Sequence, residues 1–168
     1  MLSIALALAA ASVAQQLAPA SRGLVQCQMP SPETKACFSL SKIRKTGPAS
    51  YVYDTELLVD PAGAVTATFH SPVSVRGSEV CQAINGRDIA GATFASQGQR
   101  LSGADAAAYR AQLRSNFAGM LGHTICTRVV KGGGGGHTVI GWIDGARIPA
   151  GDYEMMWVSR AAGWRVAP

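Results

Sequence analysis

An alternation of apolar and polar residues between Tyr51 and His70 predicts a β-hairpin. Residues 60–63, with the sequence DPAG, form the turn, because proline fixes φ and glycine adopts left-handed backbone readily. A three-residue loop that sets Asp60 opposite Ala64 gives the hairpin one apolar face, and a shift of one residue would mix the two faces. The predicted apolar face carries Tyr51, Tyr53, Thr55, Leu57, Val59, Val65, Ala67 and Phe69.

The polar face of this hairpin holds the main candidates for chemistry. In the predicted register Asp54 lies directly opposite His70, and Glu56 follows two residues along the same face. A histidine oriented by a carboxylate can act as a general base, and a second carboxylate can help to bind a metal. The simpler interpretation is a solvated ion pair between strands, which contributes well under ~1 kcal/mol. The enzyme hypothesis therefore depends on Asp54, Glu56 and His70, and the ion pair is the favoured interpretation.

A helical repeat follows in the second half of the chain. Ser102 and Asp105 have the spacing of a helix N-cap with an acidic residue three positions later, and Gly122 suits a helix end. Between them, apolar side chains recur every three or four residues, at Ala106, Tyr109, Leu113, Phe117 and Met120. We predict a helix over residues 103–121 that covers the apolar face of the hairpin, as core rather than as a cofactor site.

Further short strands complete the predicted fold. Residues 38–44 and 73–76 read as strands, 93–101 as a hairpin, and Asn85-Gly86 as a two-residue turn. Strands at 125–131 and 138–143 are joined by five glycines, and a last hairpin, 153–160 with 164–166, sets Arg160 opposite Trp164. The predicted fold class is α+β: a mainly antiparallel β-sheet of hairpins with one covering helix, at about 103–121, and two disulfides.

The N-terminus predicts export. Leu2 to Val13 is an apolar run followed by a small-x-small exit, which is typical of a secretory signal peptide over residues 1–14, cut after Ala14 or alternatively after Ala20. The run is shorter than the ~20 apolar residues of a membrane span, so no membrane span is expected after signal cleavage. Since no Lys or Arg precedes the run, the alternatives are a mis-assigned start codon or a buried N-terminal helix. Residues 15–26 are interpreted as a disordered leader and 27–168 as a single globular domain, periplasmic or secreted.

Four cysteines in an exported chain predict two disulfides. The favoured pairs are Cys27 with Cys37 and Cys81 with Cys126, among three possible connectivities. Cys126 follows a helix C-terminus, where the dipole disfavours a thiolate, so a nucleophile formed with His123 is disfavoured. The histidines lack metal-ligand spacing and no thiol is left over, so we assign no metal.

Charge and loop composition narrow the class of partner. The net charge is +5, from 15 basic and 10 acidic residues that are scattered along the chain, which indicates a mild bias toward anionic partners. A basic stripe with interleaved aromatic residues is missing from the sequence, so nucleic acid is not an expected partner. Lys131 precedes the glycine run 132–136, whereas a phosphate-binding loop has its lysine after the glycines, so no cofactor is expected there.

These observations favour a non-catalytic binding or structural module at the cell envelope. Its expected partner is an envelope protein or an anionic envelope component, and the chain leans away from being an enzyme because no complete active site can be recognised. One alternative is a small hydrolase or metal-dependent enzyme that uses Asp54, Glu56 and His70. The other is a secreted enzyme inhibitor, a role that small disulfide-bonded domains fill, with glycine loop 132–136 as the first place to look for contact.

Overall fold

The computed structural model describes residues 13–132 and 136–168. Its α-helices are α1 (Val13–Ser21), α2 (Gly86–Ala90) and α3 (Gly103–Asn116), and short 3-10 turns occupy Ala118–Met120, Pro149–Gly151 and Arg160–Ala162. The strands are β1 (Val25–Gln28), β2 (Ala36–Cys37), β3 (Ser39–Lys45), β4 (Ser50–Asp60), β5 (Val65–Arg76), β6 (Glu79–Ala83), β7 (Thr93–Ser96), β8 (Gln99–Arg100), β9 (Thr124–Lys131), β10 (His137–Ile143), β11 (Ala146–Arg147), β12 (Tyr153–Val158) and β13 (Arg165–Val166).

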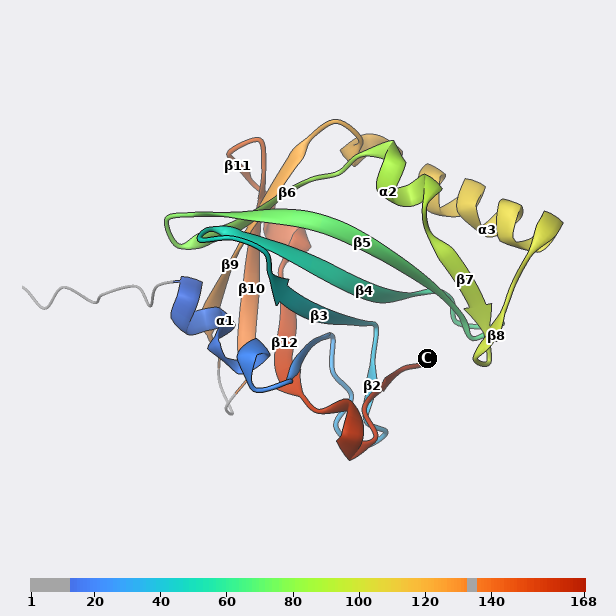
Figure 1. Ribbon diagram of the computed structural model, residues 1–168, viewed down its shortest axis with the longest axis horizontal. Coiled ribbons are helices and arrows are strands. Elements are labelled where there is room, and N and C mark those ends of the chain that lie inside the picture. The colour runs from blue at the N-terminus through green and yellow to red at the C-terminus, as the bar shows by residue number, and fades with distance from the viewer. Residues whose placement is uncertain (1–12, 133–135) are drawn as a thin grey trace, which may run out of the picture.

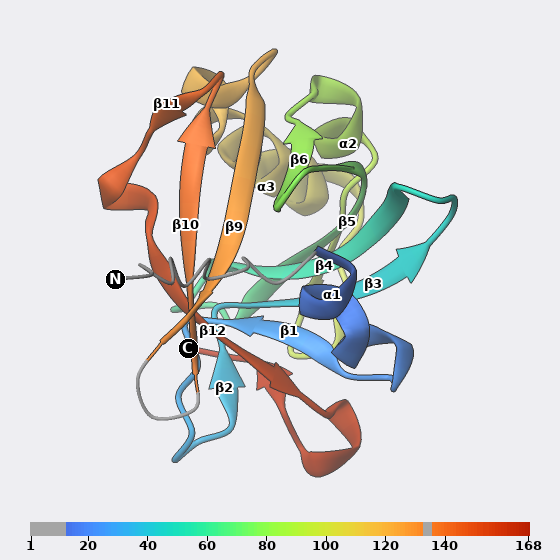
Figure 2. The ribbon, with the colours of Figure 1, turned by 90° about the vertical axis from the view of Figure 1, so that its left-hand side faces the viewer.

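Eight strands close into an antiparallel barrel, seen from two directions in Figures 1 and 2. Around the ring the order is β4, β3, β1, β12, β10, β9, β6 and β5, and β5 closes the ring by pairing with β4. β7 and β8 extend the sheet beyond β5, and β11 pairs with β10. Closure leaves the ring itself without an unpaired edge strand, which is how barrels avoid edge-to-edge association.

The central hairpin forms in the predicted register. β4 and β5 pair with Asp54 opposite His70, Glu56 opposite Thr68 and Leu57 opposite Ala67. The turn differs from the prediction: the register shifts between Leu58 and Asp60, so that Asp60 lies opposite Val65. Ala64, rather than Gly63, has the left-handed backbone there, with φ 47°.

The predicted fold class, a sheet of hairpins covered by one helix, is wrong. The apolar face of the hairpin turns toward the barrel interior, where Tyr53, Thr55 and Leu57 face residues of the opposite wall. The reason is pairing between residues far apart in the sequence: β12 pairs with both β1 and β10, and this joins the two halves of the sheet into a ring. α3 is also shorter than predicted, ending at Asn116 before the 3-10 turn.

The helices lie at opposite ends of the barrel (Figures 1 and 2). At one end, Leu113 of α3 and Ile89 of α2 pack in a core cluster with Ala67 and Phe94. At the other end, Leu17 of α1 packs with Ile43 in a cluster that also includes Tyr51, Tyr53, Val75, Val80 and Trp157. α3 therefore covers only the part of the hairpin near its turn, and strands surround the remainder.

The two predicted disulfides are present, one on each side of the barrel. Cys27 is bonded to Cys37, and Cys81 is bonded to Cys126 across the β6–β9 pair. The first disulfide belongs to a cluster on the outer surface of β1, β3 and β12, which the C-terminal residues Trp164 and Val166 cover.

The predicted C-terminal hairpin does not form. β13 runs parallel to β2, with Val166 opposite Cys37, and Arg160 binds Glu56 instead of stacking on Trp164. The C-terminal segment packs on the apolar outer surface of β1 and β3, and this packing covers apolar side chains that would otherwise be exposed.

The N-terminal residues are described only from Val13 onward, so most of the predicted signal peptide, residues 1–14, lies outside the described residues. Residues 15–26, assigned to a leader from the sequence, contain most of α1 and the first two residues of β1, and Leu17 is buried. Asn85, predicted to be in a turn, instead caps α2 by accepting a hydrogen bond from the Asp88 N–H. Among the described residues, no helix is both long and apolar enough to cross a membrane.

Candidate functional site

The interior of the barrel contains a cavity of about 200 Å³. Thirteen of its lining residues come from strands of the ring, while Ile84 follows β6 and Phe117 follows α3. The polar lining residues are Gln28, Ser39, Ser41, Tyr53, Thr55, Gln82, Thr127 and Tyr153. The apolar lining residues are Leu57, Phe69, Val73, Val80, Ile84, Phe117 and Ile125. The lining therefore combines hydroxyl and amide groups with hydrocarbon, and among the described residues no charged side chain contributes to it.

Strand alternation places these polar side chains inside the barrel. In β1, Cys27 packs in the outer cluster, so its neighbour Gln28 points inward. In β3, Leu40 packs in the same outer cluster, and Ser39 and Ser41 point inward. The sequence pattern is thus inverted at this wall of the barrel, with apolar residues outside under the C-terminal segment and polar residues inside.

Two tyrosines of the cavity are each paired with a glutamine. The Gln28 amide donates a hydrogen bond to the Tyr153 hydroxyl at 3.3 Å, and Gln26 hydrogen-bonds the hydroxyl of Tyr53. Burial raises the pKa of Tyr153 to about 12, because a phenolate would lose its hydration there. Burial also raises the pKa of Tyr53 well above its ordinary value, so both phenols stay protonated at neutral pH.

The wall formed by β3 and β4 adds three hydroxyl groups. The Ser41 and Thr55 hydroxyl oxygens lie 2.9 Å apart and share a hydrogen bond. Ser39 is only 1% exposed, and its hydroxyl is buried with no hydrogen-bond partner among the described residues. A buried polar group without a partner costs about 1–3 kcal/mol, so the Ser39 hydroxyl lowers the stability of this wall.

The end of the cavity near α3 adjoins a small apolar pocket. Phe69, Ile84 and Phe117 line both spaces. Asp88 lines only the outer pocket, where burial raises the pKa of its carboxyl and the Asn85 amide donates a hydrogen bond to it. The Asp88 carboxyl therefore belongs to the pocket beside the cavity.

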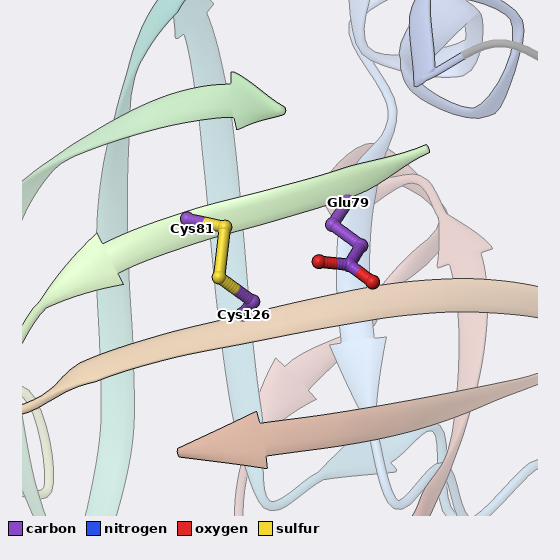
Figure 3. Close-up of side chains that lie close together, drawn as sticks. All are labelled: Glu79, Cys81 and Cys126. Carbon is purple, nitrogen blue, oxygen red and sulfur yellow. A yellow bond between two sulfur atoms is a disulfide. The ribbon is translucent and has the colours of Figure 1, made fainter. Parts of the chain in front are cut away.

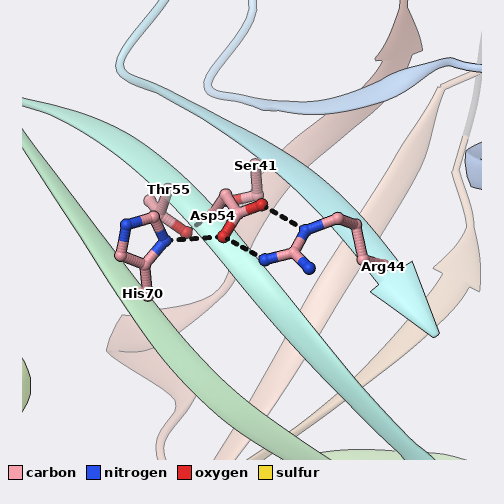
Figure 4. A network of polar contacts seen from close by, with 5 residues as sticks. All are labelled: Ser41, Arg44, Asp54, Thr55 and His70. Carbon is pink, nitrogen blue, oxygen red and sulfur yellow. Dashed lines mark hydrogen bonds and ion pairs between the residues drawn. The ribbon is translucent and has the colours of Figure 1, made fainter. Parts of the chain in front are cut away.

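The predicted pair of Asp54 and His70 is present on the outer face of the hairpin (Figure 4). His70 Nδ1 lies 2.6 Å from Asp54 Oδ1, and Arg44 donates hydrogen bonds to both carboxylate oxygens, at 2.7 and 3.1 Å. The Arg44 guanidinium, more than His70, lowers the pKa of the Asp54 carboxyl to about 2. The side chain of His70 is 70% exposed, as expected for a solvated ion pair.

The structure does not bring Glu56 into this pair. Glu56 instead accepts a hydrogen bond from Arg160 at 2.6 Å. Asp54, Glu56 and His70 line neither the barrel cavity nor the apolar pocket beside it. With each carboxylate held by an arginine, the arrangement can stabilise strand pairing, but it provides no enclosed space in which to hold a substrate against His70.

One cluster of possible metal ligands occurs in the part of the chain that the structure describes (Figure 3). It consists of Glu79, Cys81 and Cys126, whose ligand atoms lie within 4.8 Å of one another. Because the two sulfur atoms are bonded to each other, neither is a thiolate, and thiolate is the form in which cysteine binds metals. Glu79 also accepts a hydrogen bond from Arg128 at 2.9 Å, so the cluster is a disulfide beside an ion pair.

The remaining sequence candidates lie elsewhere on the surface. His123 Nδ1 lies 2.6 Å from Asp144 Oδ2, and Cys126 is in a disulfide, so the thiol and imidazole considered from the sequence are not paired. Lys131 ends β9 as predicted, and Gly132 donates a backbone hydrogen bond to Gly136 at 3.0 Å. The three glycines between them lie outside the described residues.

Sequence reasoning missed the cavity residues. Serine, threonine and glutamine on short strands normally indicate a solvated face, so the sequence does not predict that Ser39, Gln28 and Gln82 line a cavity. The available signal was the alternation in Gln26-Cys27-Gln28 and in Ser39-Leu40-Ser41. Cysteine and leucine at the central positions of both segments point to burial on one side, but the pattern alone does not reveal that the other side faces a cavity.

Comparisons with protein-family models, with curated proteins and with solved structures find no match for this chain.

Proposed function

We propose that the protein is a non-catalytic binding module that takes a small molecule into its barrel. The carrying observation is the cavity of about 200 Å³, lined by tyrosine, serine, threonine and glutamine side chains among hydrocarbon. Eight-stranded barrels have interiors of the size that holds one small ligand. Binding sites for small molecules typically combine apolar walls with a few placed polar groups, as this lining does.

The proposed place of action is the periplasm or the outside of the cell. The two disulfides support this placement, because disulfides persist in oxidising compartments. The net charge of +5 supports a weak contact between the outer surface and an envelope protein or anionic component. The barrel would then carry its ligand at the cell envelope.

The hydrolase alternative receives less support from the geometry. A general base must reach a substrate that is held in place, and His70 lies on an open outer face. The inner face of the same hairpin offers enclosure together with hydrogen-bonding groups. The binding proposal therefore rests on the inner face of the hairpin, whereas the hydrolase hypothesis rests on its outer face.

Ligand-observed NMR on the full chain, with a mixture of small uncharged and charged compounds, tests the proposal. Ser39→Leu fills part of the cavity and removes its unpartnered hydroxyl, whereas Thr68→Leu adds similar bulk on the outer face. We expect the wild type and Thr68→Leu to bind the same compounds, and Ser39→Leu to bind them at least tenfold more weakly. Equal binding by all three proteins would place the compounds outside the barrel and contradict the proposal.

A further inference from the structure

The lining of the cavity also defines the chemical class of its ligand. Building on the proposed function, we propose that the barrel selects a small uncharged molecule that carries an oxygen acceptor beside an apolar ring or chain. Three observations lead to this class: the neutrality of the lining, the direction of its hydrogen bonds, and the position and size of its apolar part.

Neutrality excludes ions as ligands. In the described part of the chain, every side chain that lines the cavity is uncharged. On the same hairpin, Asp54 and Glu56 point to the outer face, where arginines bind them. An ammonium or carboxylate group inside would lose its hydration without gaining a counterion. The effective cost of such desolvation is several kcal/mol per ion, so ions should bind far more weakly than neutral molecules of the same shape.

The hydrogen bonds of the wall leave donors facing the cavity. Gln28 donates to the oxygen of Tyr153, so the phenol proton of Tyr153 is not used in that bond. Tyr53 also lines the cavity, and its phenol stays protonated because burial raises its pKa, so it carries a second proton there. Carbonyl, ether or hydroxyl oxygens on a ligand would satisfy these donors.

The hydrocarbon part of the lining complements the donors. Leu57, Phe69 and Val73 come from the β4–β5 hairpin, Val80 and Ile125 from β6 and β9, and Phe117 lies at the end near α3. A cavity of about 150 Å³ lined by apolar side chains holds benzene, so about 200 Å³ suits a molecule of roughly eight non-hydrogen atoms. This size admits a substituted ring and excludes peptides, nucleotides and lipids.

A cluster of water molecules is the competing occupant. The space would hold about seven waters at liquid density, and waters would satisfy both tyrosines as well as a ligand would. A ligand with the proposed chemistry replaces those waters and gains the contact with hydrocarbon that water cannot make. The test below therefore separates displacement of water from simple hydration.

Four compounds of similar size test the class: benzamide, benzoate, benzylammonium and toluene. Each is titrated into the isotope-labelled full chain, following the amide signals of Gln28, Ser41 and Thr55 inside and His70 outside. We expect benzamide to shift the inner signals and to bind at least tenfold more tightly than benzoate or benzylammonium. Tyr153→Phe should weaken benzamide about fivefold, the effect of losing one hydrogen bond, and leave toluene unchanged.

The outcomes separate this inference from the proposed function. Equal binding of benzamide and benzoate overturns the neutral class, and binding of toluene without benzamide overturns the need for an oxygen acceptor; either result leaves the barrel as a binding module. If none of the four compounds moves the inner signals, the inference fails, and the wider mixture of compounds used to test the proposed function decides whether that function fails too.

Discussion

On the two faces of the β4–β5 hairpin, the pKa values of polar side chains are shifted in opposite directions. On the inner face, Tyr53 is held by an uncharged glutamine, and burial raises its pKa. On the outer face, the next residue, Asp54, is held by Arg44, and that ion pair lowers its pKa to about 2. The inner face thus stabilises the neutral form of Tyr53, whereas the outer face stabilises the charged form of Asp54, the next residue of the same strand.

The difference shows that access to water, rather than polarity, separates the two faces. Both faces carry hydroxyl, amide or carboxyl groups, but only the outer face carries full charges, where water and arginines stabilise them. On the inner face, the Ser41 and Thr55 hydroxyl groups instead share a hydrogen bond between neutral groups. A substitution should therefore be costly when it puts charge on the inner face and tolerated when it does so on the outer face.

Removing the Cys81–Cys126 disulfide should be costly although it lies on the outer face of the barrel. Val80 and Gln82 line the cavity, so Cys81 between them points outward, yet its disulfide closes a sequence separation of 45 residues. Replacing both cysteines by alanine should lower the free energy of unfolding by about 4 kcal/mol, because the unfolded chain gains loop entropy. Urea unfolding under non-reducing conditions measures the change.

The pair Cys27 and Cys37 is the matched control, since it closes a separation of only 10 residues. By the same loop argument its removal should cost about 1 kcal/mol less. An equal or smaller loss on removing the Cys81–Cys126 disulfide would show that packing around the sulfur atoms, and not loop closure, sets the effect.

Lysine substitutions on opposite faces sharpen the comparison. Thr55→Lys places an ammonium group against the uncharged cavity lining, and we expect it to lower the free energy of unfolding by about 3 kcal/mol or more. Thr68→Lys places the same group opposite Glu56 on the outer face, and its effect should stay within about 1 kcal/mol. Urea unfolding at neutral pH compares the two. Similar losses for both variants would mean that water reaches the inner face freely.

Local sequence patterns predicted the elements that depend on neighbouring residues. The register of the central hairpin follows from alternation over β4 and β5, and the two cysteine pairs favoured among three possible connectivities are the ones that form. The glycine-linked strands β9 and β10 also pair as predicted. In each case the partner residues are close in the chain or carry a distinctive side chain.

Barrel closure and the cavity could not be predicted in this way. The pairing of Val25 with Val158 joins the two ends of the chain, and no local pattern identifies which edge strands will meet. The inward serines and glutamines follow from that closure, because Ser39 would face solvent in an open sheet. Asn85 shows a smaller failure: an Asn-Gly pair suits a tight turn, but Asn85 and Asp88 have the spacing of a helix N-cap.

Burial of Tyr153 on the inner face should make the protein less stable at high pH. Because folding raises the pKa of Tyr153 from 10.0 to about 12, its contribution is complete below pH 10 and is lost as the pH rises toward 12. The free energy of unfolding should fall by roughly 1 kcal/mol per pH unit above pH 10. Tyr153→Phe should reduce that slope. Tyr109→Phe should reduce it less, because the pKa of Tyr109 is raised mainly by its hydrogen bond to Asp60 rather than by burial. An unchanged slope in Tyr153→Phe would contradict burial of this phenol.

The outer face should give the smallest effect, with the opposite dependence on pH. Folding lowers the pKa of Asp54 from 3.8 to about 2, so its contribution is present above pH 4 and is lost as the pH falls through 2. Arg44→Ala should raise the Asp54 pKa, measured by carboxyl-carbon NMR, and lower the free energy of unfolding at neutral pH by at most about 1 kcal/mol.

His70→Ala is the matched control for the Arg44 substitution. Arg44 makes the larger contribution to the low pKa of Asp54, so removing His70 should shift that pKa less than removing Arg44 does. At pH 2 and below, Arg44→Ala and the wild type should approach the same stability, because the protonated carboxyl no longer attracts the guanidinium. A larger shift in His70→Ala would make the histidine the main partner of Asp54, and the outer face would then resemble the catalytic pair considered from the sequence more than a solvated ion pair.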